Sequence, residues 1–375
     1  MSNDNQSAAG RMNSPHRLRL GLFGMNCSSG RAPIQGPHLW SGSWEDNLRV
    51  GRLADEAGLD FLLPVARWKG YGGVTDYQGA TLETITWAGG LLASTRRINV
   101  FATVHVPLIH PVLAAKQFVT VDQIGRGRFG VNLVVGWNED EFEMFGVAQR
   151  AHDARYAYAQ EWLTAVRRMW GPEEDFDATG EFLNLRQVRA KPKPFGGSQP
   201  LLINATASGI GQDFAIRNCD ALFTGLNALA DFGKFSSHMA EVKARAAQSG
   251  RSLDVYATAI VTCRATRKEA EEFRREVVLG QADWGAVDNL MRTRNADPDR
   301  MTPEELRKAR ESFAGGSGGM TIVGDPDEVV AEFERLAATG LRGLALSFIN
   351  FNEVDHFCAE VLPRMERQGL RVADA

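Results

Sequence analysis

The chain has 375 residues, of which 44% are hydrophobic, so it can bury the core of one large domain or of two ordinary ones. A formal net charge of -4 without a basic block disfavours nucleic acid as a partner, and no apolar run reaches the roughly 20 residues that would span a membrane. The four cysteines are scattered without a CxxC pair, so they predict neither disulfides nor a zinc ribbon and are typical of a cytoplasmic protein.

Eight apolar runs along the chain predict buried β-strands. Most runs are followed by helical patterning, such as the helix that Ser43 is expected to cap and the helix that Pro111 opens. This alternation indicates a parallel sheet covered by helices, and eight such units favour a (β/α)8 TIM barrel over an open doubly wound sheet. The expected strands are 17–25, 59–64, 98–104, 129–135, 201–204, 221–224, 254–262 and 342–348.

Two insertions interrupt this pattern. Residues 172–200, after the fourth strand and its helix, contain a predicted hairpin, and residues 281–319, after the seventh strand, contain a polar helix around 303–312. Loops that follow barrel strands lie at the active-site face and can act as lids. We expect residues 1–16 to form a disordered tail and residues 17–375 to form a single barrel domain.

The segment 127–146, GRFGVNLVVGWNEDEFEMFG, is the most informative part of the chain. Its first half is an apolar run that fits a strand buried on both faces, but Asn132 interrupts the run. A buried amide must be hydrogen-bonded or it costs about 1–3 kcal/mol, and polar side chains at the carboxyl ends of barrel strands line active sites. The segment therefore predicts a site with Asn132, Trp137 and an acidic loop. The alternative is an edge strand with an isolated Asn and a core Trp.

Several catalytic motifs are missing from the sequence. No GxGxxG follows the first strand, no P-loop is present, and no GxSxG surrounds Ser28 or Ser29, so classical dinucleotide binding, NTP binding and a hydrolase triad are all disfavoured. His105 and His110 share a strand-to-helix loop, but their spacing matches no helical metal pair. No metal site is expected.

Two helix openings have residues suited to an anion. The strand at 201–204 runs into small residues around Ser208, where free N–H groups and a hydroxyl can bind a phosphate. Ordinary N-capping by Ser208 explains the same pattern. Arg155 and Tyr156 open the preceding helix and suit phosphate and sugar contacts, although a solvated pair is the commoner arrangement.

The motifs of this chain resemble a known family. The run 127–146, together with ARWKGYGG, FATVHVP, HDARY, ASGIG and GLALSFINFNEVDHF, is similar to the bacterial luciferase-like flavin monooxygenases, and most similar to the branch holding the pyrimidine and dimethylsulfone monooxygenases. The resemblance covers nearly all of residues 17–368. It implies a (β/α)8 barrel that binds reduced FMN and uses dioxygen to attack a small substrate.

The resemblance also implies roles for individual residues. Contacts with the isoalloxazine ring are expected from Ala66 and Arg67. Asn132 and Glu141 are expected to bind the flavin, and Arg155, Tyr156 and Ser208 its ribityl phosphate end. Thr103 and Asn132 are expected to flank the oxygen position near the reactive edge of the ring, and Trp137 to wall the substrate pocket. The candidates for polarising the substrate are Asn204, His105 and Lys69.

The expected function is a two-component, FMNH2-dependent monooxygenase. A separate NAD(P)H:flavin reductase would supply the reduced FMN, and the substrate would be a small electron-poor molecule, either an N-heterocycle or cyclic amide such as a pyrimidine or pyridine, or a sulfone. The alternatives are a deazaflavin-dependent oxidoreductase on the same barrel and a non-catalytic flavin-binding protein. A homo-oligomer, either a dimer or a tetramer, is expected. The sequence departs from the pyrimidine enzymes in the loop VTDYQG and around 105–110, which face the expected pocket.

Overall fold

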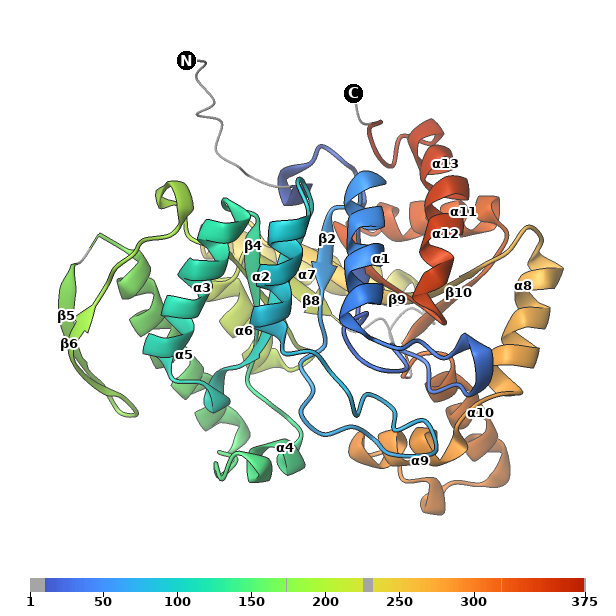
Figure 1. The fold of residues 1–375 in the computed structure, drawn as a ribbon, viewed down its shortest axis with the longest axis horizontal. Coiled ribbons are helices and arrows are strands. Elements are labelled where there is room, and N and C mark those ends of the chain that lie inside the picture. Colours follow the sequence, from blue (N-terminus) through green and yellow to red (C-terminus); the bar gives the residue numbers. More distant parts are fainter. Residues whose placement is uncertain (1–10, 173, 225–231, 318, 374–375) are drawn as a thin grey trace.

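The computed structural model describes residues 11–172, 174–224, 232–317 and 319–373. In this part of the chain, eight parallel strands close into a barrel in the order β1-β2-β3-β4-β7-β8-β9-β11, with β11 pairing back to β1 (Figure 1). The predicted (β/α)8 architecture is therefore confirmed. The barrel strands are β1 (Arg19–Phe23), β2 (Phe61–Leu63), β3 (Asn99–His105), β4 (Phe129–Val134), β7 (Leu201–Ala205), β8 (Ala221–Thr224), β9 (Asp254–Cys263) and β11 (Gly343–Phe348).

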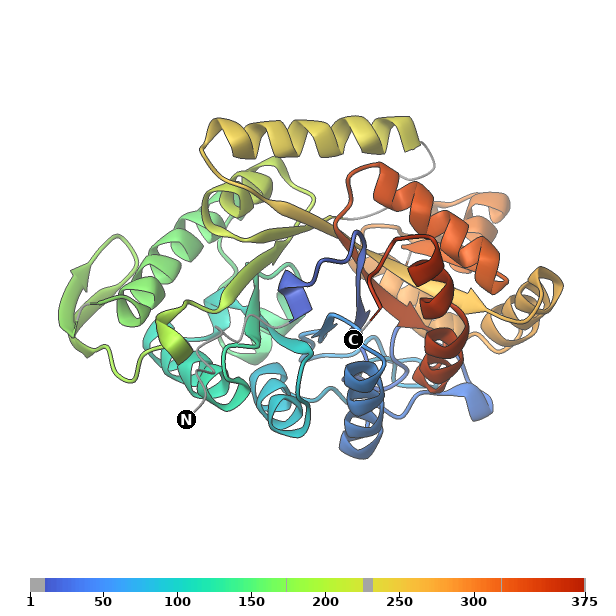
Figure 2. The ribbon, with the colours of Figure 1, turned by 90° about the horizontal axis from the view of Figure 1, so that it is seen from above.

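Helices surround the barrel, as the view onto its end shows (Figure 2). No helix of the described ranges is long and apolar enough to cross a membrane. The helices are α1 (Trp44–Glu56), α2 (Thr84–Ser94), α3 (Pro111–Gly125), α4 (Glu139–Met144), α5 (His152–Trp170), α6 (Gly209–Asn218), α7 (Phe232–Gln248), α8 (Arg267–Phe273), α9 (Trp284–Thr293), α10 (Pro303–Ala314), α11 (Pro326–Ala338), α12 (Val354–Glu360) and α13 (Leu362–Arg367).

Side-chain caps determine where several helices begin. Ser43 caps α1 as predicted, because its hydroxyl accepts a hydrogen bond from the backbone N–H of Asp46. Helix α2 begins at Thr84, since the carboxylate of Glu83 accepts from the N–H groups of Ile85 and Thr86. Such caps satisfy the first N–H groups of a helix, which have no partner within it.

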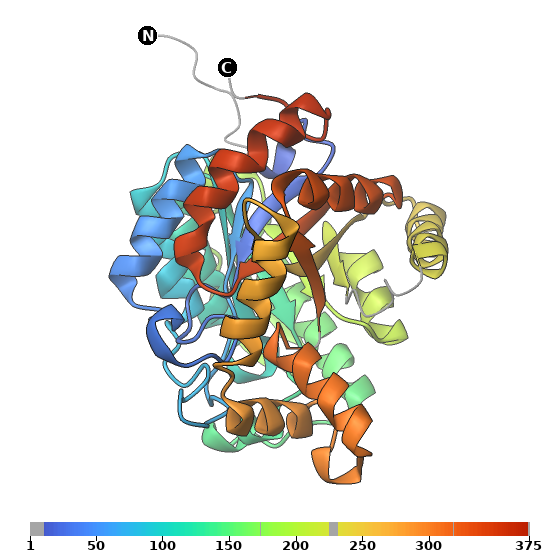
Figure 3. The ribbon, with the colours of Figure 1, turned by 90° about the vertical axis from the view of Figure 1, so that its right-hand side faces the viewer.

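Both predicted insertions are present. The first contains the antiparallel hairpin of β5 (Asp175–Thr179) and β6 (Asn184–Arg189), and the second contains α9 and α10. Helices α4, α9 and α10 lie at the end of the barrel away from the two chain ends (Figures 1 and 3). The sequence analysis missed β10 (Met320–Gly324), a short strand that pairs with the carboxyl half of β9 outside the eight-stranded closure.

Aromatic rings fill the amino-terminal half of the barrel. Phe61 contacts Phe101, Phe223 and Tyr256 edge to face, with ring centroids 6.1, 6.1 and 5.7 Å away. A Cβ on Gly130 would lie 2.3 Å from the Phe101 ring, so glycine is required at that position. The interior is a packed core rather than a pore.

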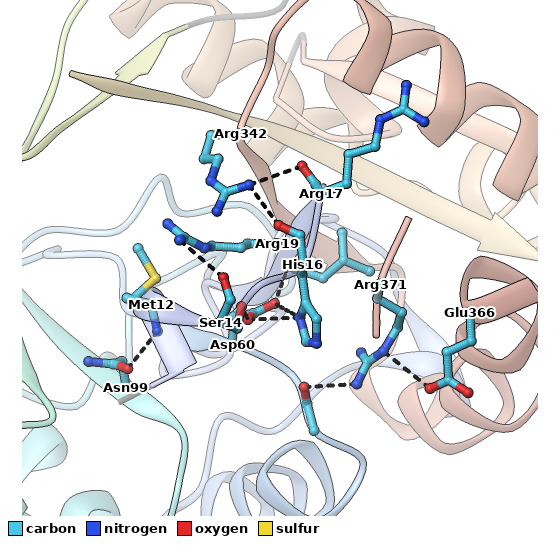
Figure 4. Close-up of polar contacts among 12 residues, drawn as sticks. Met12, Ser14, His16, Arg17, Arg19, Asp60, Asn99, Arg342, Glu366 and Arg371 are labelled. Atoms are coloured by element: carbon cyan, nitrogen blue, oxygen red, sulfur yellow. Dashed lines mark hydrogen bonds and ion pairs between the residues drawn. The ribbon is translucent and has the colours of Figure 1, made fainter. Parts of the chain in front are cut away.

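Residues 11–16, which we assigned to a tail, lie against the base of the barrel, whereas residues 1–10 lie outside the described residues (Figure 4). Met12 is buried in the same hydrophobic cluster as Phe61, and its N–H donates to the side-chain oxygen of Asn99 over 3.0 Å. The carbonyl of His16 accepts from the guanidinium of Arg342. These contacts close the amino-terminal end of the barrel.

The carboxylate of Asp60 holds this segment in place (Figure 4). It accepts hydrogen bonds from the hydroxyl of Ser14 over 2.6 Å and from the N–H of Leu20 over 2.8 Å, and it lies 3.1 Å from Nδ1 of His16. Asp60 is fully buried at the start of β2. A buried carboxylate is tolerated only with several such donors, so the base depends on this residue.

Met12→Ala should lower the free energy of unfolding by about 2 kcal/mol, because it removes a buried side chain from the closed base of the barrel. Urea denaturation measures this change. Met144→Ala is the matched control, since Met144 is 58% exposed and its truncation should change stability by less than about 0.5 kcal/mol. Equal effects of the two substitutions would show that the segment does not contribute to the core.

Candidate active site

A cavity of about 400 Å³ opens at the carboxyl ends of the barrel strands. This volume is in the usual range for small-molecule sites. Of the nine residues that the sequence analysis assigned to the site, the cavity brings together all except Glu141. Those lining it are Ala66, Arg67, Thr103, Asn132, Trp137, Arg155, Tyr156 and Ser208.

Thr103 and Asn132 form a hydrogen-bonded pair in this cavity. They are opposite each other in the register of β3 and β4. The Thr103 hydroxyl donates to the carbonyl of Pro64 over 2.7 Å and accepts from Nδ2 of Asn132 over 3.2 Å. These bonds fix the orientation of the Asn132 amide. Its Oδ1 is buried without a partner among the described residues, which suits a ligand that donates a hydrogen bond there.

Glu141 organises the loop that follows β2. Its Oε1 accepts from the guanidinium of Arg67 and from the N–H of Trp68, each over 2.9 Å. Both charged side chains are more than nine-tenths buried. We predicted that Glu141 would bind a ligand, but it lies behind the cavity wall, where it fixes the position of Arg67.

His105 lies between this cavity and a second one of about 260 Å³, because it lines both. Burial lowers the pKa of His105 to about 4, against the opposing attraction of Glu141, whose Oε2 is 3.8 Å from Nε2. His105 is therefore neutral at pH 7. Its Nδ1 is buried without a partner among the described residues, so it can bond a substrate.

The start of α6 presents hydroxyl groups and free backbone N–H groups to the cavity. Ser208 caps the helix by accepting from the N–H of Gly211, and Thr206 links the hydroxyls of Ser208 and Tyr156 at 3.3 and 3.1 Å. A Cβ on Gly211 would lie only 2.2 Å from the Thr206 hydroxyl, so a side chain there would displace this group. Ser208 is thus an N-cap, as the alternative of ordinary capping predicted, but it also lines the cavity.

Arg155 lies at the same end of the cavity. Its Nη1 donates to the carbonyl of Gly136, which holds the guanidinium at the wall, and its Nε is buried without a partner among the described residues. A guanidinium beside the start of α6 combines a full charge with the positive end of the helix. This end of the cavity can bind a phosphate.

Trp137 is half-exposed at the mouth of the cavity. The guanidinium carbons of Arg294 and Arg67 lie 4.3 and 5.3 Å from its ring centroid, within the range of cation–π attraction. The sequence analysis did not select Arg294, which comes from the second insertion, nor Arg31 and Thr206, which also line the cavity. Only Thr206 had a signal, because it lies two residues before the predicted cap.

The three candidates for polarising a substrate differ in whether they line the cavity. His105 lines the cavity. Asn204 is buried and donates to the carbonyl of Leu133, and its Oδ1 has no partner in the described part of the chain. Lys69 pairs with Asp140 over 2.7 Å at the surface and does not line the cavity. His110 caps α3 through its Nδ1.

The residues present fit reduced FMN. One end of the cavity offers a charged guanidinium, three hydroxyls and a helix start for a phosphate, and the other offers a buried amide oxygen and the Arg67 loop for a polar ring. Within the described ranges, no group of three His, Cys, Asp or Glu side chains could hold a metal ion.

The chain is similar to characterised oxygenases over most of its length. The sequence model of the luciferase-like monooxygenase family matches residues 19–343. The FMNH2-dependent dimethylsulfone monooxygenase of Pseudomonas fluorescens is 29% identical over 329 residues, which cover 84% of this chain and 86% of the relative. Pyrimidine monooxygenase RutA of Cronobacter sakazakii is 30% identical over 340 residues, which cover 88% of this chain and 98% of the relative.

The fold is shared with solved structures. The crystal structure of DmoA from Hyphomicrobium sulfonivorans matches with a TM-score of 0.86 at 19% identity, over 96% of this chain and 90% of that chain. At this level of identity the likeness shows the shared fold.

The neutral His105 should make stability depend on pH. An unfolded histidine takes up a proton near pH 6.5, whereas folded His105 does so only near pH 4. Between these values the unfolded state binds the extra proton, so stability falls as the pH falls, by at most about 3 kcal/mol. His105→Gln should flatten the decline in unfolding free energy between pH 7 and 5, measured by urea denaturation. His356→Gln, at an exposed position, is the control, and identical pH profiles for all three proteins would contradict the assignment.

Proposed function

The chain belongs to the luciferase-like monooxygenase family, and on this premise we propose that it is the oxygenase of a two-component system. A separate NAD(P)H:flavin reductase would supply reduced FMN, and dioxygen would be the second substrate. The observation that carries the proposal is the cavity itself, which has a phosphate-suited helix start at one end and the Thr103–Asn132 pair at the other. The absence of a GxGxxG motif after the first strand also favours a separate source of electrons.

The cofactor would be held at both ends of the cavity. Arg155, Tyr156 and Ser208 would bind the phosphate by charge-assisted and neutral hydrogen bonds. Ala66 and Arg67 would contact the isoalloxazine ring, and Asn132 would bond its polar edge through the unpaired Oδ1. Glu141 would act through Arg67, because its carboxylate holds that guanidinium in place.

Bound reduced FMN supplies the two electrons with which dioxygen is reduced. The protein must then orient the oxygen and keep water away from it. Thr103 and Asn132 would position the oxygen because their hydroxyl and amide form hydrogen bonds and do not ionise at neutral pH. Trp137 and the second insertion would cover the substrate. Neutral His105, which lines the cavity, is the group that would polarise it, because Asn204 does not reach the cavity.

The substrate would be a small electron-poor molecule, such as an N-heterocycle, a cyclic amide or a sulfone. Pyrimidine and dimethylsulfone monooxygenases are the relatives that support this class. The rival functions are a deazaflavin-dependent oxidoreductase and a non-catalytic flavin-binding protein. We propose a homo-oligomer, a dimer or a tetramer, as the working assembly.

Arg155→Ala should weaken binding of reduced FMN by about ten- to a hundredfold, because one charge-assisted hydrogen bond to phosphate is lost. Anaerobic titration measures this change. Riboflavin, which has no phosphate, should lose much less. Arg150→Ala is the control, since Arg150 stacks on Tyr158 instead of lining the cavity. If parent and variant distinguish FMN from riboflavin equally well, Arg155 does not bind phosphate. Preferential binding of a reduced deazaflavin by the parent would favour the rival enzyme.

Thr103→Val and Asn132→Leu should uncouple oxygen consumption from product formation. Candidate heterocycles and sulfones are assayed with NADH and a flavin reductase, and product, oxygen and hydrogen peroxide are measured together. Both variants should release as hydrogen peroxide most of the oxygen that the parent incorporates, with melting temperatures close to that of the parent. Thr262→Val removes a buried barrel hydroxyl outside the cavity and should stay coupled. Unchanged coupling with a lowered melting temperature would assign the pair to the scaffold.

A further inference from the structure

Positive charge predominates among the residues that line the cavity. Four arginines line it, and no Asp or Glu side chain is among its lining residues in the described part of the chain. Arg67 is neutralised by Glu141, and Arg155 is assigned to the phosphate. Arg31 and Arg294 are assigned neither to an ion pair nor to the phosphate.

Arg31 follows β1 and lies within the cavity wall. Its guanidinium carbon lies 4.7 Å above the ring of Phe23, and its aliphatic stem packs where a Cβ on Gly24 would be. Its Nε is buried without a partner, and no ion pair involves Arg31 within the described residues. Packing therefore fixes the side chain while its N–H donors stay free. An ordered guanidinium with free donors is suited to bind an anionic acceptor.

Arg294 enters the cavity from the second insertion. It directly follows α9, remains exposed to solvent, and holds its guanidinium 4.3 Å from the ring of Trp137. Arg31 and Arg294 line the same cavity, so both present their positive charge to it. No carboxylate pairs with Arg294 among the described residues. Two cations that line one cavity without an acidic partner repel each other, and an anion bound between them removes that repulsion.

The phosphate of the proposed cofactor cannot be that anion. In the barrel order, β1 and β7 are on opposite sides, separated by three strands in either direction. Arg31 follows β1, whereas Ser208 and the start of α6 follow β7. A phosphate bound at α6 therefore lies across the barrel mouth from Arg31.

We propose that the substrate carries an oxyanion, a carboxylate or a sulfonate, and that Arg31 and Arg294 bind it. This inference rests on the proposed oxygenase function and specifies its substrate class as an electron-poor small molecule with an acidic group. Guanidinium groups suit such an anion because each can donate two parallel hydrogen bonds to it.

The test measures ligand binding apart from turnover. Matched pairs of probes differ by one acidic group: orotate with uracil, methanesulfonate with dimethylsulfone, and nicotinate with nicotinamide. Binding is measured by calorimetry without oxygen and with saturating reduced FMN, so that the phosphate site is filled. The variants are Arg31→Gln and Arg294→Gln, with Arg294→Lys as the conservative change. Arg300→Gln is the control, because it removes an 85% exposed charge from the same insertion.

At least one acid should bind the parent tenfold or more tightly than its neutral partner. Arg31→Gln and Arg294→Gln should abolish that preference, Arg294→Lys should restore part of it, and Arg300→Gln should keep it. The inference is overturned if no acid is preferred, or if the two Gln variants lose affinity for reduced FMN while the preference for acids remains. Failure of the parent to bind reduced FMN at all would instead refute the proposed function, and the acids are then titrated without it.

Discussion

The alternation of side chains along a closed barrel is the constraint on which this site depends. Phe101, Thr103 and His105 occupy every second position of β3, so all three point to the same side of the strand. Phe101 comes first along the strand and packs edge to face on Phe61 in the barrel core. Thr103 and His105 follow toward the carboxyl end and line the cavity. The aromatic floor therefore sets the depth of the cavity, and the next positions along the strands supply its polar groups.

A single buried carboxylate, that of Glu141, positions part of the cavity wall. Glu141 connects the loop after β2 with α4, because it accepts from both the Arg67 side chain and the Trp68 backbone. It also lies 3.8 Å from His105, at the end of β3. One residue that does not itself line the cavity thus holds the loop after β2 against α4, close to the end of β3. Removing such a buried partner leaves an uncompensated charge, so the wall and its electrostatics are set together.

The sequence carried the architecture more clearly than the details of the site. Apolar runs predicted the eight barrel strands because strands buried on both faces are continuously hydrophobic. The motifs around Asn132 predicted the family, and the resemblance to that family supplied residues such as Thr103. The sequence of residues 11–16 did not predict their packing, because the partners of Met12 and Ser14 are Asn99 and Asp60, which are far away along the chain. Arg31 and Arg294 were missed for the same reason.

Both ends of the described chain meet at the base of the barrel. The N–H of Leu18 bonds the carbonyl of Leu370, and Arg342 bonds the carbonyl of His16, whereas the cavity opens at the opposite end of the strands. A flavin reductase fused to either terminus would consequently release its product behind the barrel, with no covered path to the cavity mouth. Tethering the two enzymes would raise the local concentration of reduced flavin but could not channel it, so the transfer would still pass through oxygenated solvent.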